Sequence, residues 1–432
     1  MSSSETATSN ATQPLSPDDI LPAVQDALQS TPIVDIHTHT FSPQLGALGL
    51  WGIDNLVTYH YLEAELFRCN PIRPADYWEL SVHQRADLIW QTLFVERAPL
   101  SEACRGVIAV LQAFGLDTNA ATLDQAREFF GSRAIDTHID DVFRLAGMAE
   151  AVMTNDPLDP AEAPLWMKGL APDPRFHAVI RLDRILNGWA KHWSQLAEQG
   201  YAVEEDAGGR TVAEVRRFLS DWFKRMSPVY MAVSLPNTFA FPEESIRAKL
   251  LAEAVLPSCK ELGVPMSLMI GVRYQVNPAL RLAGDAVGRA DLGALERICV
   301  QFPDNRFLVS VLSRENQHEL CVYARKFGNM LPFGCWWFLN NPSIVEEMTR
   351  ERLEMLGTSF VPQHSDARVL EQVIYKWRNT RRTLAPILAD SFRLLRDDGR
   401  TITRADIQAE VARLLHGNTR EWLGSRVMAA GK

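Results

Sequence analysis

The sequence predicts a (β/α)8 barrel, and three of its features support this fold class. Eight short apolar runs are spread along the chain, and most of them are separated by amphipathic segments of helical length. The runs are apolar throughout instead of alternating, as expected for a parallel sheet that is buried on both faces. An open doubly wound sheet, the alternative fold, usually carries a glycine-rich phosphate loop after its first strand. Here that place holds His37-Thr38-His39, which favours the barrel.

The elements can be assigned in chain order. A helix is expected at about 17–30, followed by a first strand that ends at His37. A helical insertion is expected at about 50–148, because apolar residues recur there with the 3.6-residue period of a helix. C-terminal helices are expected at about 367–432. The other seven strands are expected at 151–154, 177–182, 230–235, 266–272, 307–312, 331–338 and 359–364. Helices between them are expected at about 211–226, 243–262, 290–301, 315–327 and 343–356.

The composition indicates a soluble, cytoplasmic protein. Of its 432 residues, 47% are hydrophobic and 22% charged, and no run approaches the ~18 apolar residues of a membrane span. The net charge of −9 argues against nucleic acid and anionic membranes as partners. The six cysteines form no CxxC pair, as expected of free thiols in a reducing compartment. Residues 1–14 lack the features of a signal peptide and are expected to be a disordered tail. No linker divides residues 15–432, so we expect a single domain; whether the chain forms a homo-oligomer stays open.

His37 and His39 are candidate metal ligands. In an extended strand, residues i and i+2 project from the same face, so the two imidazoles would lie side by side. Zn²⁺ and Mn²⁺ accept imidazole ligands. Asp366 ends the eighth strand, which lies beside the first in a closed barrel, so it could complete a three-ligand site that leaves positions open. Alternatively, Asp366 is a buried carboxylate that pairs with Arg368.

Arginines are frequent where the predicted strands end. Arg181, Arg273 and Arg368 occupy such positions, at the mouth of the barrel where chemistry gathers. Guanidinium groups bind carboxylate or phosphate in bidentate fashion, so the three together predict an anionic substrate. For each arginine alone, an ion pair within the barrel rim is an equally good interpretation. His364 lies two residues before Asp366 and could be a further ligand, an acid–base group or a structural histidine.

Seven motifs, in order, resemble the uronate isomerases (glucuronate isomerases) of the amidohydrolase superfamily. The most distinctive is Phe333-Gly334-Cys335-Trp336-Trp337-Phe338, which resembles the family's FGSxWWF. The others are Asp35-Ile36-His37-Thr38-His39, His60-Tyr61, Thr154-Asn155-Asp156-Pro157-Leu158-Asp159, Arg181-Leu182-Asp183, Gly271-Val272-Arg273 and Ser365-Asp366-Ala367-Arg368. The resemblance spans about residues 30 to 385 and implies common fold and ancestry.

The resemblance implies an enzyme that interconverts an aldohexuronate and its ketose by proton transfer between C1 and C2. His37, His39 and Asp366 would hold a divalent metal, with zinc expected first and manganese or another divalent ion as the alternative. The catalytic residues would be Tyr61, Asp366 and His60. The substrate-binding residues would be Arg181, Arg273, Arg368, Trp336 and Trp337.

The chain also departs from the family pattern. Met269 stands where the family has a histidine on strand 5, and Leu62-Glu63-Ala64 replaces a Lys-Trp-Arg after His60-Tyr61. Methionine neither transfers a proton nor suits a site rich in hard oxygen ligands. We therefore expect a divergent member. Two alternatives stay open: a metal-dependent hydrolase or lyase of a similar substrate, and a non-catalytic barrel that binds a ligand.

Overall fold

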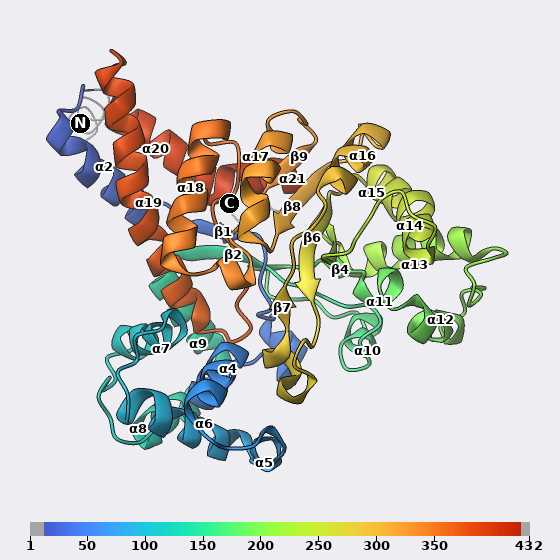
Figure 1. Ribbon diagram of the computed structural model, residues 1–432, viewed down its shortest axis with the longest axis horizontal. Coiled ribbons are helices and arrows are strands. Elements are labelled where there is room, and N and C mark those ends of the chain that lie inside the picture. The colour runs from blue at the N-terminus through green and yellow to red at the C-terminus, as the bar shows by residue number, and fades with distance from the viewer. Residues whose placement is uncertain (1–12, 425–432) are drawn as a thin grey trace.

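The strands lie at the centre of the molecule and are surrounded by helices (Figure 1). The computed structural model describes residues 13–424, so all but the end of the tail expected at 1–14 lies outside the described residues. One sheet has the order β1 (Ile33–Asp35), β2 (Met148–Val152), β3 (Phe176–His177). The other follows the path β4 (Ile180–Arg181), β5 (Met231–Pro236), β6 (Met266–Arg273), β8 (Phe307–Val311), β9 (Met330–Pro332), and β7 (Ala286–Val287) pairs with β6. Every pairing between these strands is parallel except β6 with β7.

The predicted α/β class with parallel strands is confirmed, but the strands do not close into one continuous barrel. The eighth strand, expected at 359–364, is reduced to a single bridge between Val361 and Phe333. Two features explain this. Pro362 has no backbone N–H to donate to a ladder. The Gln363 side chain instead accepts the N–H of Cys335, at 2.8 Å, and so takes the place of a main-chain acceptor.

The last segment nevertheless reaches the first strand. The N–H of Asp366 donates to the carbonyl of His37 at 3.2 Å, and the N–H of His39 donates to the carbonyl of Ala367 at 2.7 Å. These bonds lie beyond β1, which ends at Asp35 and not at His37 as expected. They bring residues more than 300 positions apart in sequence into direct contact, and this contact creates the candidate site.

The insertion between β1 and β2 is helical, as expected, and it packs below the strands in the view of Figure 1. Ser81 begins one of its helices with a capping box, in which its hydroxyl accepts the N–H of Gln84 and the Gln84 side chain accepts the N–H of Ser81. Its elements are η1 (Pro43–Leu48), α3 (Ile53–Val57), α4 (His60–Cys69), α5 (Pro74–Glu79), α6 (Val82–Trp90), η2 (Gln91–Val95), α7 (Glu102–Ala113), α8 (Asp124–Gly131) and α9 (Ile135–Ala146).

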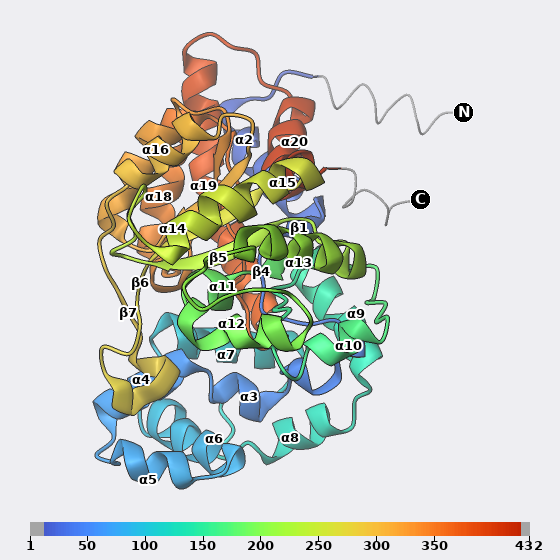
Figure 2. The same ribbon diagram turned by 90° about the vertical axis from the view of Figure 1, so that its right-hand side faces the viewer.

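The remaining helices cover the strands on the other sides, and Figure 2 shows α12 to α15 along one flank. The elements after β2 are α10 (Ala163–Met167), α11 (Asp183–Leu186), α12 (Trp189–Glu198), α13 (Thr211–Met226), α14 (Ile246–Leu250), η3 (Leu251–Val255), α15 (Leu256–Leu262), η4 (Pro278–Gly284), α16 (Gly293–Gln301), η5 (Arg314–Asn316), α17 (Gln317–Ala324), η6 (Trp337–Leu339) and α18 (Pro342–Leu356). The long α19 (Gln372–Asp397) packs against α2 (Pro17–Ser30), α7, α9 and α18. The chain then continues through α20 (Arg404–Ala412), η7 (Arg413–Gly417) and α21 (Asn418–Leu423).

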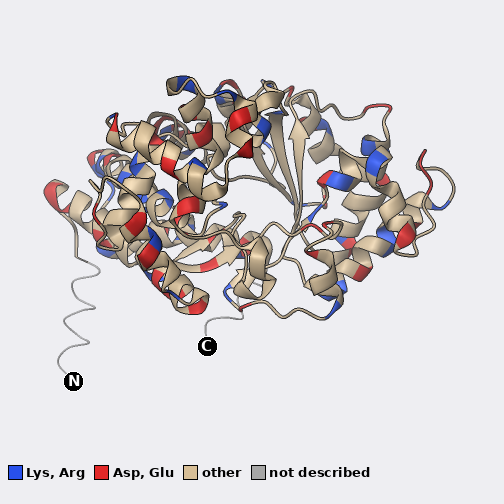
Figure 3. Ribbon diagram, turned by 90° about the horizontal axis from the view of Figure 1, so that it is seen from below, with Lys and Arg blue, Asp and Glu red and all other residues tan. Residues whose placement is uncertain are grey.

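One hydrophobic cluster extends from Ile20 in α2 to Leu415 near the end of the described chain. This continuity supports our proposal that residues 15–432 form a single domain. A second cluster includes Val34, Val152, Val179 and Met269, which come from different parts of the two sheets and the connection between β3 and β4. Met269 therefore packs among apolar side chains. Charged residues lie mainly on the outer helices and loops (Figure 3).

No helix within residues 13–424 combines the length and the hydropathy that a membrane span requires.

Candidate active site

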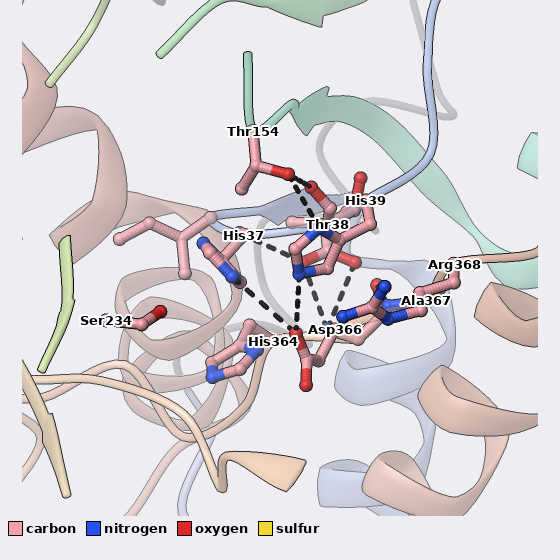
Figure 4. Close-up of polar contacts among 12 residues, drawn as sticks. His37, Thr38, His39, Thr154, Ser234, His364, Asp366, Ala367 and Arg368 are labelled. Carbon is pink, nitrogen blue, oxygen red and sulfur yellow. Dashed lines mark hydrogen bonds and ion pairs between the residues drawn. The ribbon is translucent and has the colours of Figure 1, made fainter. Parts of the chain in front are cut away.

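Two histidines and one aspartate converge where β1 ends, as the sequence predicts. Nε2 of His37 lies 3.6 Å from Oδ1 of Asp366, and Nε2 of His39 lies 3.4 Å from the same oxygen. Figure 4 shows both imidazoles directed at this one carboxylate oxygen. His37 is only 4% exposed, and one ligand atom from each of the three residues lies within 4.8 Å of the others.

Hydrogen bonds determine which nitrogen of each histidine carries the proton. The hydroxyl of Tyr230 donates to the carbonyl of Ile36 at 2.9 Å, so it can only accept from Nδ1–H of His37, at 3.1 Å. The hydroxyl of Thr154 donates to the carbonyl of Thr38 at 3.1 Å and accepts from Nδ1–H of His39 at 2.8 Å. Both neutral imidazoles therefore present the lone pair of Nε2 to Asp366.

The local electrostatics keep the two imidazoles neutral. Burial, the largest influence, lowers the pKa of His37 to about 3, although the carboxylate of Asp366 acts in the opposite direction. Burial and the nearby guanidinium groups of Arg368 and Arg181 place the pKa of His39 well below its usual value. A neutral imidazole is the form that binds metal ions.

This arrangement fits a divalent metal ion. Two imidazole lone pairs and a carboxylate oxygen that face one another repel unless a positive charge lies between them. In a tetrahedral site with bonds of about 2.1 Å, neighbouring donor atoms lie about 3.4 Å apart. The two separations above, 3.4 and 3.6 Å, are close to that spacing. His37, His39 and Asp366 could therefore hold such an ion and leave a fourth position open.

Asp366 has a backbone conformation that supports its position. Its φ angle is +49°, in the left-handed region that non-glycine residues seldom adopt, although aspartate and asparagine tolerate it better than most. The two flanking hydrogen bonds to the His37–His39 segment hold it there. This strain, at a residue that faces the two histidines, is typical of a functional position.

Asp35 connects the first strand to the segment that carries Asp366. Its carboxylate is fully buried and accepts hydrogen bonds from the N–H groups of His37 (3.3 Å) and Ser365 (3.1 Å) and from Nε1–H of Trp377 (3.0 Å). Burial raises its pKa to about 6, and these donors work against that rise.

Asparagine in place of Asp35 is expected to lower the free energy of unfolding by about 1–3 kcal/mol. The new amide directs an N–H group toward donors that need an acceptor, so at least one buried donor loses its partner. Chemical denaturation monitored by circular dichroism measures the change. Trp377→Phe, which removes one donor and leaves the carboxylate, should have a smaller effect. Equal losses in the two variants would contradict this account.

Two arginines face the same region but differ in their partners. Arg181 pairs with Asp183 at 2.8 Å, and although burial acts to lower its pKa, Asp183 raises it above the usual arginine value. Arg368 has no ion pair and no side-chain hydrogen bond within residues 13–424. Its guanidinium is therefore available for an anion from outside the chain. The alternative prediction was that Asp366 pairs with Arg368. Among the described residues, no ion pair joins these two side chains.

A cavity of about 160 Å³ contains this region. It is smaller than the ~300–1,000 Å³ of pockets for drug-sized ligands, which suits a small metabolite. It is lined by eight of the residues singled out from the sequence: His37, His39, His60, Arg181, Trp336, Trp337, Asp366 and Arg368. The other lining residues are Ser234, Val272, Tyr274, Leu282 and Asp285.

Tyr61 and Arg273 do not line the cavity. Tyr61 stacks on Phe338, with the ammonium group of Lys376 5.8 Å from the centre of its ring, and burial raises its pKa well above the usual value. Arg273 is exposed at the end of β6, where Ala286 pairs with it. Their expected roles stay predictions.

His364 is buried beside the three converging residues but is not one of them. Its ring centre lies 5.1 Å from that of His37, and both of its ring nitrogens lack a hydrogen-bond partner within residues 13–424. Burial lowers its pKa to about 3. A side chain at Gly334, whose φ angle is +68°, would collide with this ring, so the glycine of the Phe333–Phe338 motif makes room for it.

The sequence contains no local signal for several residues that shape the site. Tyr230 lies at the start of an apolar run and looks like an ordinary core residue, yet its hydroxyl orients His37. Tyr274 and Asp285 belong to a loop without a motif. Only the position of Tyr274, directly after Arg273 at a strand end, could have suggested it.

Comparison with known proteins identifies the family. No protein-family model matches the chain, and no curated protein matches it. Among solved structures, a uronate isomerase from Bacillus halodurans C-125 is 46% identical, with a TM-score of 0.94 over 96% of this chain and 99% of that one. A uronate isomerase from Thermotoga maritima is 15% identical, with a TM-score of 0.75 over 94% of this chain and 97% of its own. A glucuronate isomerase from Caulobacter crescentus is 14% identical, with a TM-score of 0.66 over 94% of both chains.

The last two likenesses show a shared fold, whereas the first also shows descent. Because almost half of the residues are shared along nearly the full length of both chains, this protein belongs to the uronate isomerase family of enzymes.

Proposed function

We propose that this protein interconverts an aldohexuronate, such as glucuronate or galacturonate, and the corresponding ketose by moving a proton between C1 and C2. One observation carries the proposal. The three residues that could hold a metal ion, His37, His39 and Asp366 (the metal-ready group), share one small cavity with Arg368, whose guanidinium has no ion-pair partner within residues 13–424. Such a site suits a substrate with an anionic group and several oxygen atoms. The structural match to a uronate isomerase supports the same reaction.

The substrate would be held through its carboxylate. Arg368 offers a planar, bidentate donor with no competing partner among the described residues, and Arg181, already oriented by Asp183, adds positive charge to the same cavity. Trp336 and Trp337 are largely buried and provide an apolar wall that limits access of water. The cavity lining thus combines charged groups that recognise the substrate with apolar groups that shield it from water.

The proton transfer requires an acid–base group near C1 and C2. Asp366 faces the histidines with Oδ1, and its Oδ2 has no hydrogen-bond partner within residues 13–424, so this oxygen would accept and return the proton. His60 lines the same cavity, and its Nε2 also lacks a partner among the described residues, which makes it a candidate donor to a sugar oxygen. General acid–base catalysis of this kind is typically worth ~10²–10⁴-fold.

His37, His39 and Asp366 would hold a divalent ion, with zinc proposed first and manganese as the alternative. When bound, the ion would act as a Lewis acid toward the oxygens at C1 and C2. Tyr230 and Thr154 would keep both imidazoles in the binding tautomer.

Replacement of Tyr230 by phenylalanine is expected to weaken zinc binding about 10–100-fold, because Nδ1–H of His37 loses its acceptor and the ring loses its orientation. Competition with a fluorescent zinc chelator measures the affinity. Tyr323→Phe, whose hydroxyl lies at the surface near Glu296, is the matched control. An affinity for zinc within twofold of the wild type would argue against this positioning role.

The reaction itself is tested by incubating the metal-loaded protein with glucuronate or galacturonate in D₂O. We expect the ketose to form with deuterium at C1 and, through the reverse reaction, the remaining aldose to gain deuterium at C2, both followed by NMR. His37→Ala should abolish the exchange, whereas His318→Ala, which changes an exposed histidine, should not. Hydrolysis of a lactone or ester without any exchange would refute the proposal and indicate a metal-dependent hydrolase instead.

A further inference from the structure

The connection between β6 and β7, residues 274–285, extends from the strands to the insertion. Nε1–H of Trp78 in α5 donates to the carbonyl of Ala279 at 2.8 Å, and the guanidinium of Arg281 lies 4.4 Å from the centre of the Trp78 ring. Figures 1 and 2 show this connection beside α4 of the insertion. The loop is thus held against the insertion through Trp78, and its two ends are joined by the pairing of β6 with β7.

Two polar side chains of this loop line the cavity that contains the metal-ready group. They are Tyr274, which directly follows β6, and Asp285, which directly precedes β7. Oδ1 of Asp285 accepts the N–H of Gln275 at 2.7 Å, which orients its carboxylate. Asp285 forms no ion pair within residues 13–424. A carboxylate that is held in place but not neutralised therefore shares the cavity with Arg181 and Arg368.

The positive charge of Arg181 and Arg368 and the negative charge of Asp285 suit different groups of a bound sugar acid. A negative group on a ligand is attracted to the guanidinium groups and to the proposed cation and is repelled by Asp285, so the carboxylate of a sugar acid turns away from Asp285. A carboxylate is a strong acceptor for hydroxyl groups, and a tyrosine hydroxyl can donate or accept. Asp285 and Tyr274 are therefore suited to the secondary hydroxyls of the same molecule.

We propose that Asp285 and Tyr274 are specificity-determining residues that recognise the configuration of the sugar acid's secondary hydroxyl groups. This inference rests on the proposed function, because it concerns how the same site chooses among hexuronates. A site built to hydrogen-bond a hydroxyl discriminates strongly against a substrate that presents it differently, because a polar group is then left unpaired.

The test compares kcat/KM of wild type, Asp285→Asn and Tyr274→Phe for glucuronate and for its epimers at C3, C4 and C5. Asparagine can still accept the N–H of Gln275, so the loop should keep its conformation. We expect Asp285→Asn to change the ratio of kcat/KM between at least two epimers by about tenfold or more, and Tyr274→Phe to change it less. Metal content and melting temperature should stay at the wild-type values.

Asp291→Asn is the matched control, because its carboxylate also accepts a backbone N–H but lies at the surface outside the cavity. It should leave every ratio unchanged. If wild type is active but both loop variants keep all ratios within twofold of the wild-type values, the specificity role is refuted while the proposed function stands. If wild type shows no exchange with any hexuronate, the proposed function fails, and this inference fails with it.

Discussion

Asparagine in place of Asp366 is expected to lower kcat/KM for uronate isomerisation by about 10⁴-fold and to remove most of the bound metal. The substitution removes the negative charge that balances a cation between His37 and His39, and it also removes the oxygen proposed to carry the proton. Asparagine tolerates the left-handed backbone at this position, where φ is +49°, so the loss should not come from misfolding. Alanine would add backbone strain and is the less informative replacement.

The measurements for Asp366→Asn are metal content after dialysis, exchange in D₂O and thermal unfolding. Asp304→Asn serves as the control, because it removes an exposed carboxylate that only pairs with Lys260. The control should match the wild type in all three measurements. If Asp366→Asn retained both its metal and more than about a tenth of its activity, the assignment of this carboxylate would be wrong.

Replacement of Arg368 by methionine is expected to raise KM for the uronate and to lower kcat/KM by about 30- to 3,000-fold, which corresponds to about 2–5 kcal/mol. Methionine keeps the length and the apolar stem but offers no donor to a carboxylate. Because Arg368 has no ion-pair partner within residues 13–424, its loss deprives no carboxylate in this part of the chain of a partner, and the melting temperature should change little.

Lysine at position 368 separates charge from geometry. It keeps the positive charge but not the bidentate fork, so we expect only partial recovery of kcat/KM. Arg181→Met gives the contrast: it should lower both activity and stability, since Asp183 loses the partner at 2.8 Å. Arg314→Met, which removes an exposed arginine that pairs with Glu347, is the neutral control. Wild-type kcat/KM in Arg368→Met would exclude this arginine as the carboxylate anchor.

Met269, which departs from the family pattern, has a structural explanation. It is 1% exposed and belongs to a buried hydrophobic cluster that also includes Val34 and Val152. The chain thus retains His37, His39 and Asp366, while the apolar Met269 occupies the position of the family's strand-5 histidine.

Part of the site could be predicted from the sequence. The direction of side chains along an extended segment depends only on local spacing, and the neighbours of a strand in a barrel follow from the order of the strands in the chain. Alternation along an extended chain predicts that His37 and His39 act together, and the closed order of a barrel predicts that Asp366 lies beside them. The three side chains converge as predicted, whereas their joint action on a metal stays a prediction. The apolar runs likewise predicted the parallel α/β fold, but not the replacement of the last strand by single contacts around Pro362.

The sequence by itself determined the fold class and the set of chemical groups at the strand ends. Only the tertiary structure decided how those groups are placed: Tyr230 selects the tautomer of His37, a loop brings Asp285 to the cavity wall, and Arg273 is exposed and does not line the cavity. The physical reason is that hydrophobic burial follows a short-range pattern, whereas the partner of a polar group depends on which distant segments meet. Tyr230 and His37 are 193 residues apart, and no local pattern connects them.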